Sequence, residues 1–161
     1  MNLALARYGA TTNRVLPTLA RAAPTAGNAG ELAQFTALVN GFRRTGGLAS
    51  SDEVLCWLRP HADQPISVLA RWIVTRQAVS FEWQGCIFLP VFQFDREDMA
   101  LRAGPREVAL ELRGAFDDWD VAYWFSQPNS WLIGVAPVDL IATDQAAVLQ
   151  AARADRFIAR G

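Results

Sequence analysis

The stretch from residue 78 to residue 92 reads Ala-Val-Ser-Phe-Glu-Trp-Gln-Gly-Cys-Ile-Phe-Leu-Pro-Val-Phe. β-Branched and aromatic residues stand on both sides of a Gln-Gly pair, which is the pattern of two antiparallel strands joined by a tight turn. Alternation places Val79, Phe81 and Trp83 on one face of the first strand. The stretch therefore predicts a β-hairpin around which the neighbouring helices pack.

Three helical patterns precede the hairpin. Apolar residues recur at helical spacing from residue 32 to residue 42, and the pattern stops at Gly46-Gly47. The segment 50–53 offers an N-cap with acids in the first turn of a short helix that Pro60 ends. Pro65 opens the third helix. The order helix, helix-turn-helix, hairpin is that of a winged helix-turn-helix, whose second short helix can enter a DNA major groove, and it is also that of a generic small core.

The helix predicted at 65–76 has two different sides. Its polar side carries Ser67, Arg71 and Thr75, spaced four residues apart, and we expect it to be exposed. Its apolar side is expected to face the core and carries Ile66, Leu69, Ala70, Ile73 and Val74. If the chain binds DNA, the expected contacts are Ser67, Arg71, Thr75 and Arg76.

Composition limits the classes of protein to which the chain can belong. It has 161 residues, of which 52% are apolar and 19% charged, which is material for one domain or two very small ones. No apolar run approaches the roughly 18 residues that span a bilayer. All fifteen basic residues are arginine, so Schiff-base and P-loop lysine chemistry is excluded. Residues 1–78 carry eight arginines and four acids, whereas residues 79–161 carry seven arginines and twelve acids.

Catalytic patterns are missing from the sequence. His61 is the single histidine, which excludes paired-histidine metal sites, and no nucleophile elbow, dinucleotide-binding or P-loop motif occurs. Acid clusters at 95–98 and 117–120 are explained as helix starts. Cys56 and Cys86 have no partner at CxxC spacing, and we expect them to be buried thiols in a reducing compartment. We therefore expect a cytoplasmic protein that is not an enzyme and uses no metal or cofactor.

The second half of the chain is expected to be helical and rich in aromatic side chains. Gly104-Pro105 precedes one helix, Asp117-Asp118 caps a second, and Asp144 starts the last. Six aromatic rings fall within the sixteen residues from Phe116 to Trp131. A small domain does not easily bury so many, so a protein-binding face competes with a compact aromatic core as the interpretation.

The segment 119–153 resembles the toxin-binding domain of Xre/MbcA/ParS-type antitoxins. The shared motif is an aromatic helix, then Pro-Asn-x-x-Leu, then a glycine-bearing loop, then Pro-Val/Leu-Asp/Glu-Leu-Leu. The residues that fall on it in order are Phe125, Pro128, Asn129, Leu132, Gly134, Pro137, Asp139 and Leu140. Members of that family usually have Gly-Gly and a basic residue in the loop, where this chain has Ile133-Gly134-Val135-Ala136. Upstream, the segment 83–95 is similar to the wing that joins a helix-turn-helix to this domain.

Composition, the order of the expected elements and the resemblance together predict a mainly α-helical protein with three parts. These are a flexible tail at 1–29, a winged helix-turn-helix-like module with a β-hairpin at 30–98, and a small helical toxin-binding module at 99–161. The implied function is to bind and occlude a cognate toxin of the RES or a related NAD-consuming class, with DNA-binding autoregulation at promoter DNA as a second role. Alternatives are a DNA-binding regulator without a toxin and a self-associating scaffold, and we expect a homo-oligomer. The expected toxin-binding residues are Trp119, Tyr123, Pro128, Asn129, Trp131, Leu132, Gly134, Arg153, Arg156 and Arg160.

Overall fold

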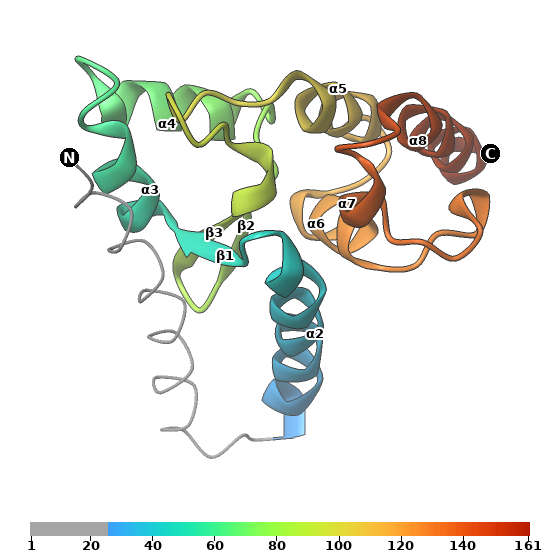
Figure 1. The fold of residues 1–161 in the computed structure, drawn as a ribbon. Coiled ribbons are helices and arrows are strands. Elements are labelled where there is room, and N and C mark those ends of the chain that lie inside the picture. Colours follow the sequence, from blue (N-terminus) through green and yellow to red (C-terminus); the bar gives the residue numbers. More distant parts are fainter. Residues whose placement is uncertain (1–25) are drawn as a thin grey trace. The chain divides into compact units, whose positions relative to one another are not determined.

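A computed structural model describes residues 26–161 of the chain. Most of the expected tail at 1–29 lies outside the described residues. The first described helix, α2, covers Ala26–Phe42 and so includes the last residues of the expected tail. The described fold is mainly helical and contains one three-stranded antiparallel sheet (Figure 1). Residues 36–161 form one compact unit, so the boundary expected between residues 98 and 99 falls inside it.

The predicted hairpin is confirmed as strands β2 (Phe81–Trp83) and β3 (Cys86–Pro90). Gln84 and Gly85 form its turn, and both have positive φ angles, 50° and 76°, as a two-residue turn that matches the twist of its strands requires. A third strand, β1 (Leu48–Ser50), pairs with the other edge of β3, which gives the order β1-β3-β2. The sequence analysis did not predict β1.

Helices α3 (Ser51–Leu58) and α4 (Pro65–Val74) lie between β1 and β2 in the chain. The predicted cap of α3 is present as a full capping box, because the Ser50 hydroxyl accepts from the Glu53 backbone N–H and the Glu53 carboxylate accepts from the Ser50 backbone N–H. Pro65 stands at the first turn of α4, where its missing N–H leaves no hydrogen bond unmade. These local signals fix where both helices begin.

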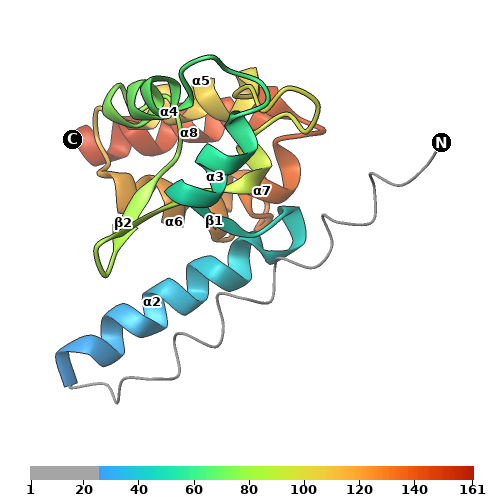
Figure 2. The same ribbon diagram turned by 90° about the vertical axis from the view of Figure 1, so that its left-hand side faces the viewer.

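Helices make up the rest of the unit. They are α5 (Ala103–Leu112), α6 (Asp118–Ser126), α7 (Pro137–Leu140) and α8 (Gln145–Arg160), with the 3-10 helix η3 (Ser130–Leu132) between α6 and α7. The predicted caps are confirmed, because Asp117 accepts from the Asp120 backbone N–H and Asp144 accepts from that of Ala147. Helices α5 and α8 lie side by side in both views (Figures 1 and 2). None of the helices in the described range 26–161 has the length and apolar character needed to cross a membrane.

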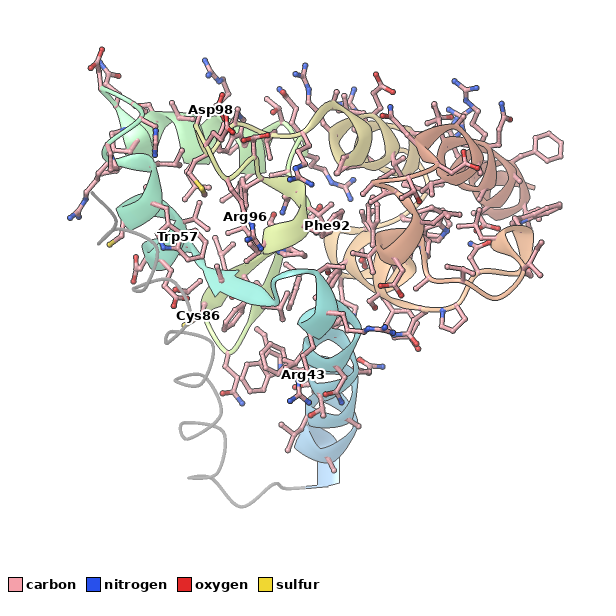
Figure 3. All side chains as sticks on the ribbon, viewed as in Figure 1. Arg43, Trp57, Cys86, Phe92, Arg96 and Asp98 are labelled. Carbon is pink, nitrogen blue, oxygen red and sulfur yellow. The ribbon has the colours of Figure 1, made fainter. Side chains whose placement is uncertain are left out.

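The core joins the segment after β3 to helices on both sides of it in the chain. The ring of Phe92, which is labelled in Figure 3, stacks on the ring of Phe42 with centroids 5.7 Å apart and lies 5.1 Å from the ring of Phe125. The adjacent side chain of Gln93 is buried and accepts from the Val79 backbone N–H at 2.7 Å while it donates to the Val79 and Pro90 carbonyls at 2.8 and 2.9 Å. Gln93 therefore provides hydrogen-bond partners for three buried backbone groups of Val79 and Pro90.

Two expectations about burial are wrong. The side of α4 expected to face the core is split, because Leu69 is buried whereas Ile66 and Val74 are 71% and 80% exposed. Ile73 packs on the core cluster as expected, and so does Trp72, which lies outside the expected side. Cys56 and Cys86 are both exposed, because Cys56 lies on the outer side of α3 and Cys86 stands directly after the hairpin turn.

Candidate functional site

The segment 127–136, called the 127–136 loop below, carries a group of exposed apolar side chains. Trp131 is 55% exposed, Ile133 is 95% exposed, and Val135 is also exposed. The loop contains no charged residue. Large apolar side chains that gather at one place on a surface are typical of protein-binding sites, whereas scattered single ones are not.

Hydrogen bonds close the backbone of this loop on itself. The Asn129 N–H donates to the Val135 carbonyl at 3.2 Å, and the Gly134 N–H donates to the Asn129 carbonyl at 2.9 Å. The Asn129 side chain also accepts from the Trp131 backbone N–H at 2.9 Å. Ile133 ends η3 in the left-handed region with a φ of 56°, which costs a β-branched residue about 1–2 kcal/mol. The loop thus holds an exposed isoleucine in a conformation that suits glycine.

A single carboxylate ties this loop to α8. Oδ2 of Asp155 accepts from Trp124 Nε1 at 2.7 Å and from Asn129 Nδ2 at 2.8 Å, and Oδ1 accepts from Trp131 Nε1 at 2.8 Å. Hydrogen bonds to an ionised acceptor are stronger than neutral ones. Asp155 therefore connects α6, the loop and α8 through three side chains at once.

The sequence analysis missed both Asp155 and Ile133 as residues of the site. Asp155 is the only acid on α8 and lies 24 to 31 residues from its three donors. No local sequence pattern therefore predicts its role. Ile133 was noted only as a departure from the family pattern. A β-branched residue directly before Gly134, where that pattern has glycine, is the signal that could have found it.

The residues expected to bind a partner are divided by the structure. Trp131, Pro128, Gly134 and Tyr123 are exposed, and the first three belong to the loop. Leu132 is 6% exposed and Asn129 is buried, so these two side chains hold the loop from within. Trp119 packs edge-on against Phe81 of β2, with ring centroids 5.0 Å apart, and lies at the contact between α6 and the hairpin.

The three arginines of α8 lie along its contact with α5. Arg156 forms an ion pair with Glu111 at 2.7 Å, and Arg153 approaches the same carboxylate at 3.9 Å. Arg160 donates to the Gly114 carbonyl at 3.3 Å. Beside them, Phe157 and Ile158 are both largely exposed. The end of α8 therefore offers apolar surface, while the guanidinium groups are already engaged with α5 and the residues after it.

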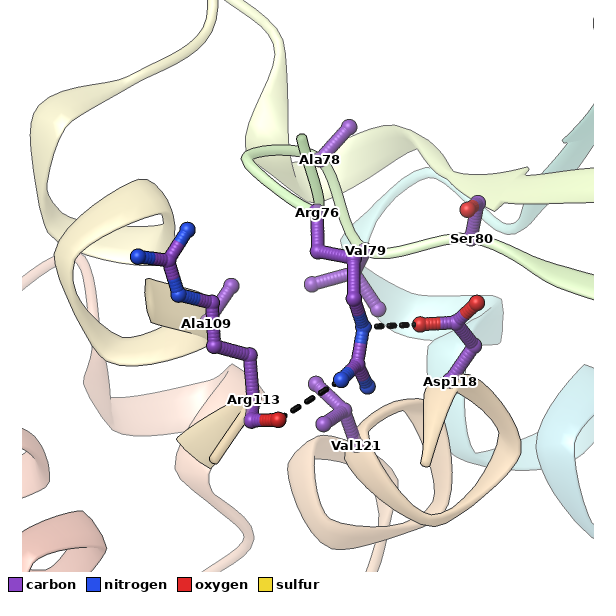
Figure 4. A pocket seen from close by; sticks show the side chains of 8 residues that line it. All are labelled: Arg76, Ala78, Val79, Ser80, Ala109, Arg113, Asp118 and Val121. Carbon is purple, nitrogen blue, oxygen red and sulfur yellow. Dashed lines mark hydrogen bonds and ion pairs between the residues drawn. The ribbon is translucent and has the colours of Figure 1, made fainter. Parts of the chain in front are cut away.

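The four residues expected to contact DNA do not form one face. Ser67, Arg71 and Thr75 are exposed, as the sequence analysis expected. Arg76 instead points to the start of α6 and the end of α5, where it pairs with Asp118 and donates to the Arg113 carbonyl at 2.7 Å (Figure 4). It also donates to the Phe116 carbonyl at 2.7 Å. Its guanidinium is occupied within the chain.

The sequence segment that contains α4 is acidic overall. Residues 48–98 carry four arginines and seven acids. The exposed side of α4 presents Ile66 and Val74 beside Arg71, whereas DNA-binding faces gather several cations because phosphate contacts supply most of the affinity.

Within residues 26–161, no three His, Cys, Asp or Glu side chains lie close enough together to share a metal ion. Comparison of the chain with family models, with curated proteins and with solved structures finds no match. The function must therefore be argued from the chain's own residues and geometry.

Proposed function

We propose that the chain is an antitoxin-like protein that binds a partner toxin through the 127–136 loop and blocks it. The observation that carries this proposal is the loop itself, in which exposed Trp131 and Ile133 stand on a backbone fixed by internal hydrogen bonds and by Asp155. The resemblance to the toxin-binding domain of Xre/MbcA/ParS-type antitoxins covers the same segment. It suggests a toxin of the RES or a related NAD-consuming class.

Physical principles support a binding role for this loop. Tryptophan is among the residues that contribute most to protein interfaces when they are buried on binding. A loop that is ordered before binding loses less conformational entropy on association, so more of the contact energy appears as affinity. In this role the chain would act by covering the toxin's active site and would carry out no chemistry.

Co-expression tests the proposal. The reading frame next to this chain's gene should encode a protein that arrests growth when it is expressed alone, and the full chain should restore growth and co-purify with it. Ile133→Asp places a charge at the most exposed apolar position, so it should abolish rescue. The matched control is Ile66→Asp, which changes a largely exposed isoleucine on α4 and should rescue like the wild type.

Two results of this experiment would contradict the proposal. If the wild-type chain neither rescues growth nor co-purifies with the neighbouring product, the toxin-binding proposal is wrong. Equal loss of rescue with both aspartate variants would show that the loop is not the specific contact surface.

A second candidate function is a DNA-binding regulator, alone or combined with toxin binding. The observation that favours it is the order β1, α3, α4, β2, β3 with the sheet order β1-β3-β2, which suits a winged helix-turn-helix with α4 as its recognition helix. Arg71 would then contact phosphate. Electrophoretic retardation of the chain's own promoter fragment at low salt tests this function, and a wild-type chain that causes no retardation would exclude it.

A further inference from the structure

We propose that Asp155 is the positioning residue of the 127–136 loop: its carboxylate fixes Trp131 and Ile133 in the geometry in which a partner protein binds them. This inference rests on the proposed function, because it assigns the group that prepares the same surface. Asp155 itself stands on α8 and reaches the loop through hydrogen bonds from Asn129 and Trp131.

The chemistry of the network requires a carboxylate at this place. Its three donors are two indole N–H groups and one amide N–H, and none of these nitrogens can accept a hydrogen bond in return. A carboxylate is the side chain that accepts on both oxygens and donates nothing when ionised. An asparagine at position 155 would turn an NH₂ group toward at least one of the three donors.

Asn129 passes the constraint from Asp155 to the backbone of the loop. Its Nδ2 donates to Asp155, while its Oδ1 accepts from the Trp131 backbone N–H. Asp155 therefore holds the Trp131 indole directly and holds the backbone beside it through Asn129. Ile133 follows two residues later, in its left-handed conformation, so the same group controls both exposed side chains.

The experiment compares Asp155→Asn with Asp120→Asn in the full chain. Both changes replace a carboxylate by an amide of the same shape, but the Asp120 side chain is exposed on α6 and receives no hydrogen bond from the loop. Two properties are measured for each variant: the NMR resonances of the Trp124 and Trp131 indole N–H groups in the free chain, and the Kd for the product of the neighbouring reading frame.

The expected result is specific to Asp155→Asn. The indole N–H resonances of Trp124 and Trp131 should shift, because their charged acceptor is gone, and binding should weaken about tenfold, the effect of losing roughly one charge-assisted hydrogen bond. Asp120→Asn should leave both properties as in the wild type. If Asp155→Asn shifts the resonances but binds the partner as tightly as the wild type, the positioning role is wrong.

Trp131→Phe keeps the test decisive if Asp155→Asn does not fold. It preserves an aromatic ring at a half-exposed position and removes the N–H that Asp155 accepts, together with the rest of the five-membered ring, so it should fold normally and bind several-fold more weakly; unchanged affinity would overturn the inference. If the wild type itself does not bind the neighbouring product, the proposed function fails. The indole resonances of the free variants then decide separately whether Asp155 fixes the loop.

Discussion

The exposed side of α4 and the 127–136 loop both present bare apolar side chains, but they differ in what holds those side chains in place. Ile66 and Val74 stand on a regular helix whose other side packs on the core. Trp131 and Ile133 stand on an irregular loop that two hydrogen bonds to Asp155 and several internal ones keep in one conformation. Exposure alone therefore does not identify a binding surface, whereas a dedicated support for exposed side chains is a better indication.

Trp124 and Trp131 both donate to Asp155, so variants of these two residues distinguish most clearly a side chain that supports the loop from one that forms its exposed surface. Trp124 is half-buried and lies edge-on to Phe125 at 5.2 Å, and Trp124→Ala should lower the free energy of unfolding by about 3 kcal/mol because it removes packing and a hydrogen bond together. Thermal melts of the variant and the wild type measure this loss. An unchanged melting temperature would mean that Trp124 does not support the loop.

Trp131→Ala should act mainly on the complex. Removal of a tryptophan from the centre of an interface costs about 2 kcal/mol, which is roughly a thirtyfold loss of affinity for the neighbouring gene product by calorimetry. Ile66→Ala on α4 is the comparison variant, and its affinity should change less than twofold. A Trp131→Ala chain that melts early but still neutralises the toxin would show that this ring belongs to the core of the molecule.

Ile133→Asn should change stability and binding in opposite directions. Asparagine tolerates the left-handed conformation, so the free energy of unfolding should rise by up to about 1 kcal/mol. The complex should weaken about tenfold, because the apolar side chain that a partner would bury is lost. Denaturant unfolding and calorimetry on the same preparation measure both quantities, and a parallel loss of stability and affinity would contradict this assignment.

The smallest effect is expected from α4, through Arg71→Ala. If the chain retards its promoter fragment, the variant should bind more weakly, and the slope of log K against log salt should fall by about 0.9 for one phosphate contact. The control is Arg59→Ala, which replaces an exposed arginine directly after α3. Equal slopes for Arg71→Ala and the wild type would remove Arg71 from any DNA contact.

Local signals made much of the fold predictable. The Gln84-Gly85 turn, the caps at Ser50, Asp117 and Asp144, and the proline at the start of α4 each act over a few residues, and the structure contains all of them. The orientation of α4 was not predictable in the same way, because apolar side chains occur around most of its circumference and tertiary packing selects which of them are buried.

The sequence predicted which segment forms the candidate site but not the contacts that hold that segment in place. Aromatic clustering and the Pro128-Asn129 motif indicated the 127–136 loop, where Trp131 is exposed. Its role in an interface stays a prediction. The roles of Asp155 and Arg76 depend on partners 24 or more residues away, and strand β1 depends on pairing with β3 across 40 residues. Such long-range relations leave no periodic trace in the sequence.

The hydrogen bonds of Gln93 determine which positions near the sheet tolerate substitution. Its amide forms hydrogen bonds to backbone atoms, namely the N–H and carbonyl of Val79 and the carbonyl of Pro90. Side chains at positions 79 and 90 can therefore be exchanged without loss of these hydrogen bonds, while the whole chemical requirement falls on position 93, which must both donate and accept. Distant relatives with this architecture should then be recognised by a lone amide after the third strand, amid segments whose residues have otherwise diverged.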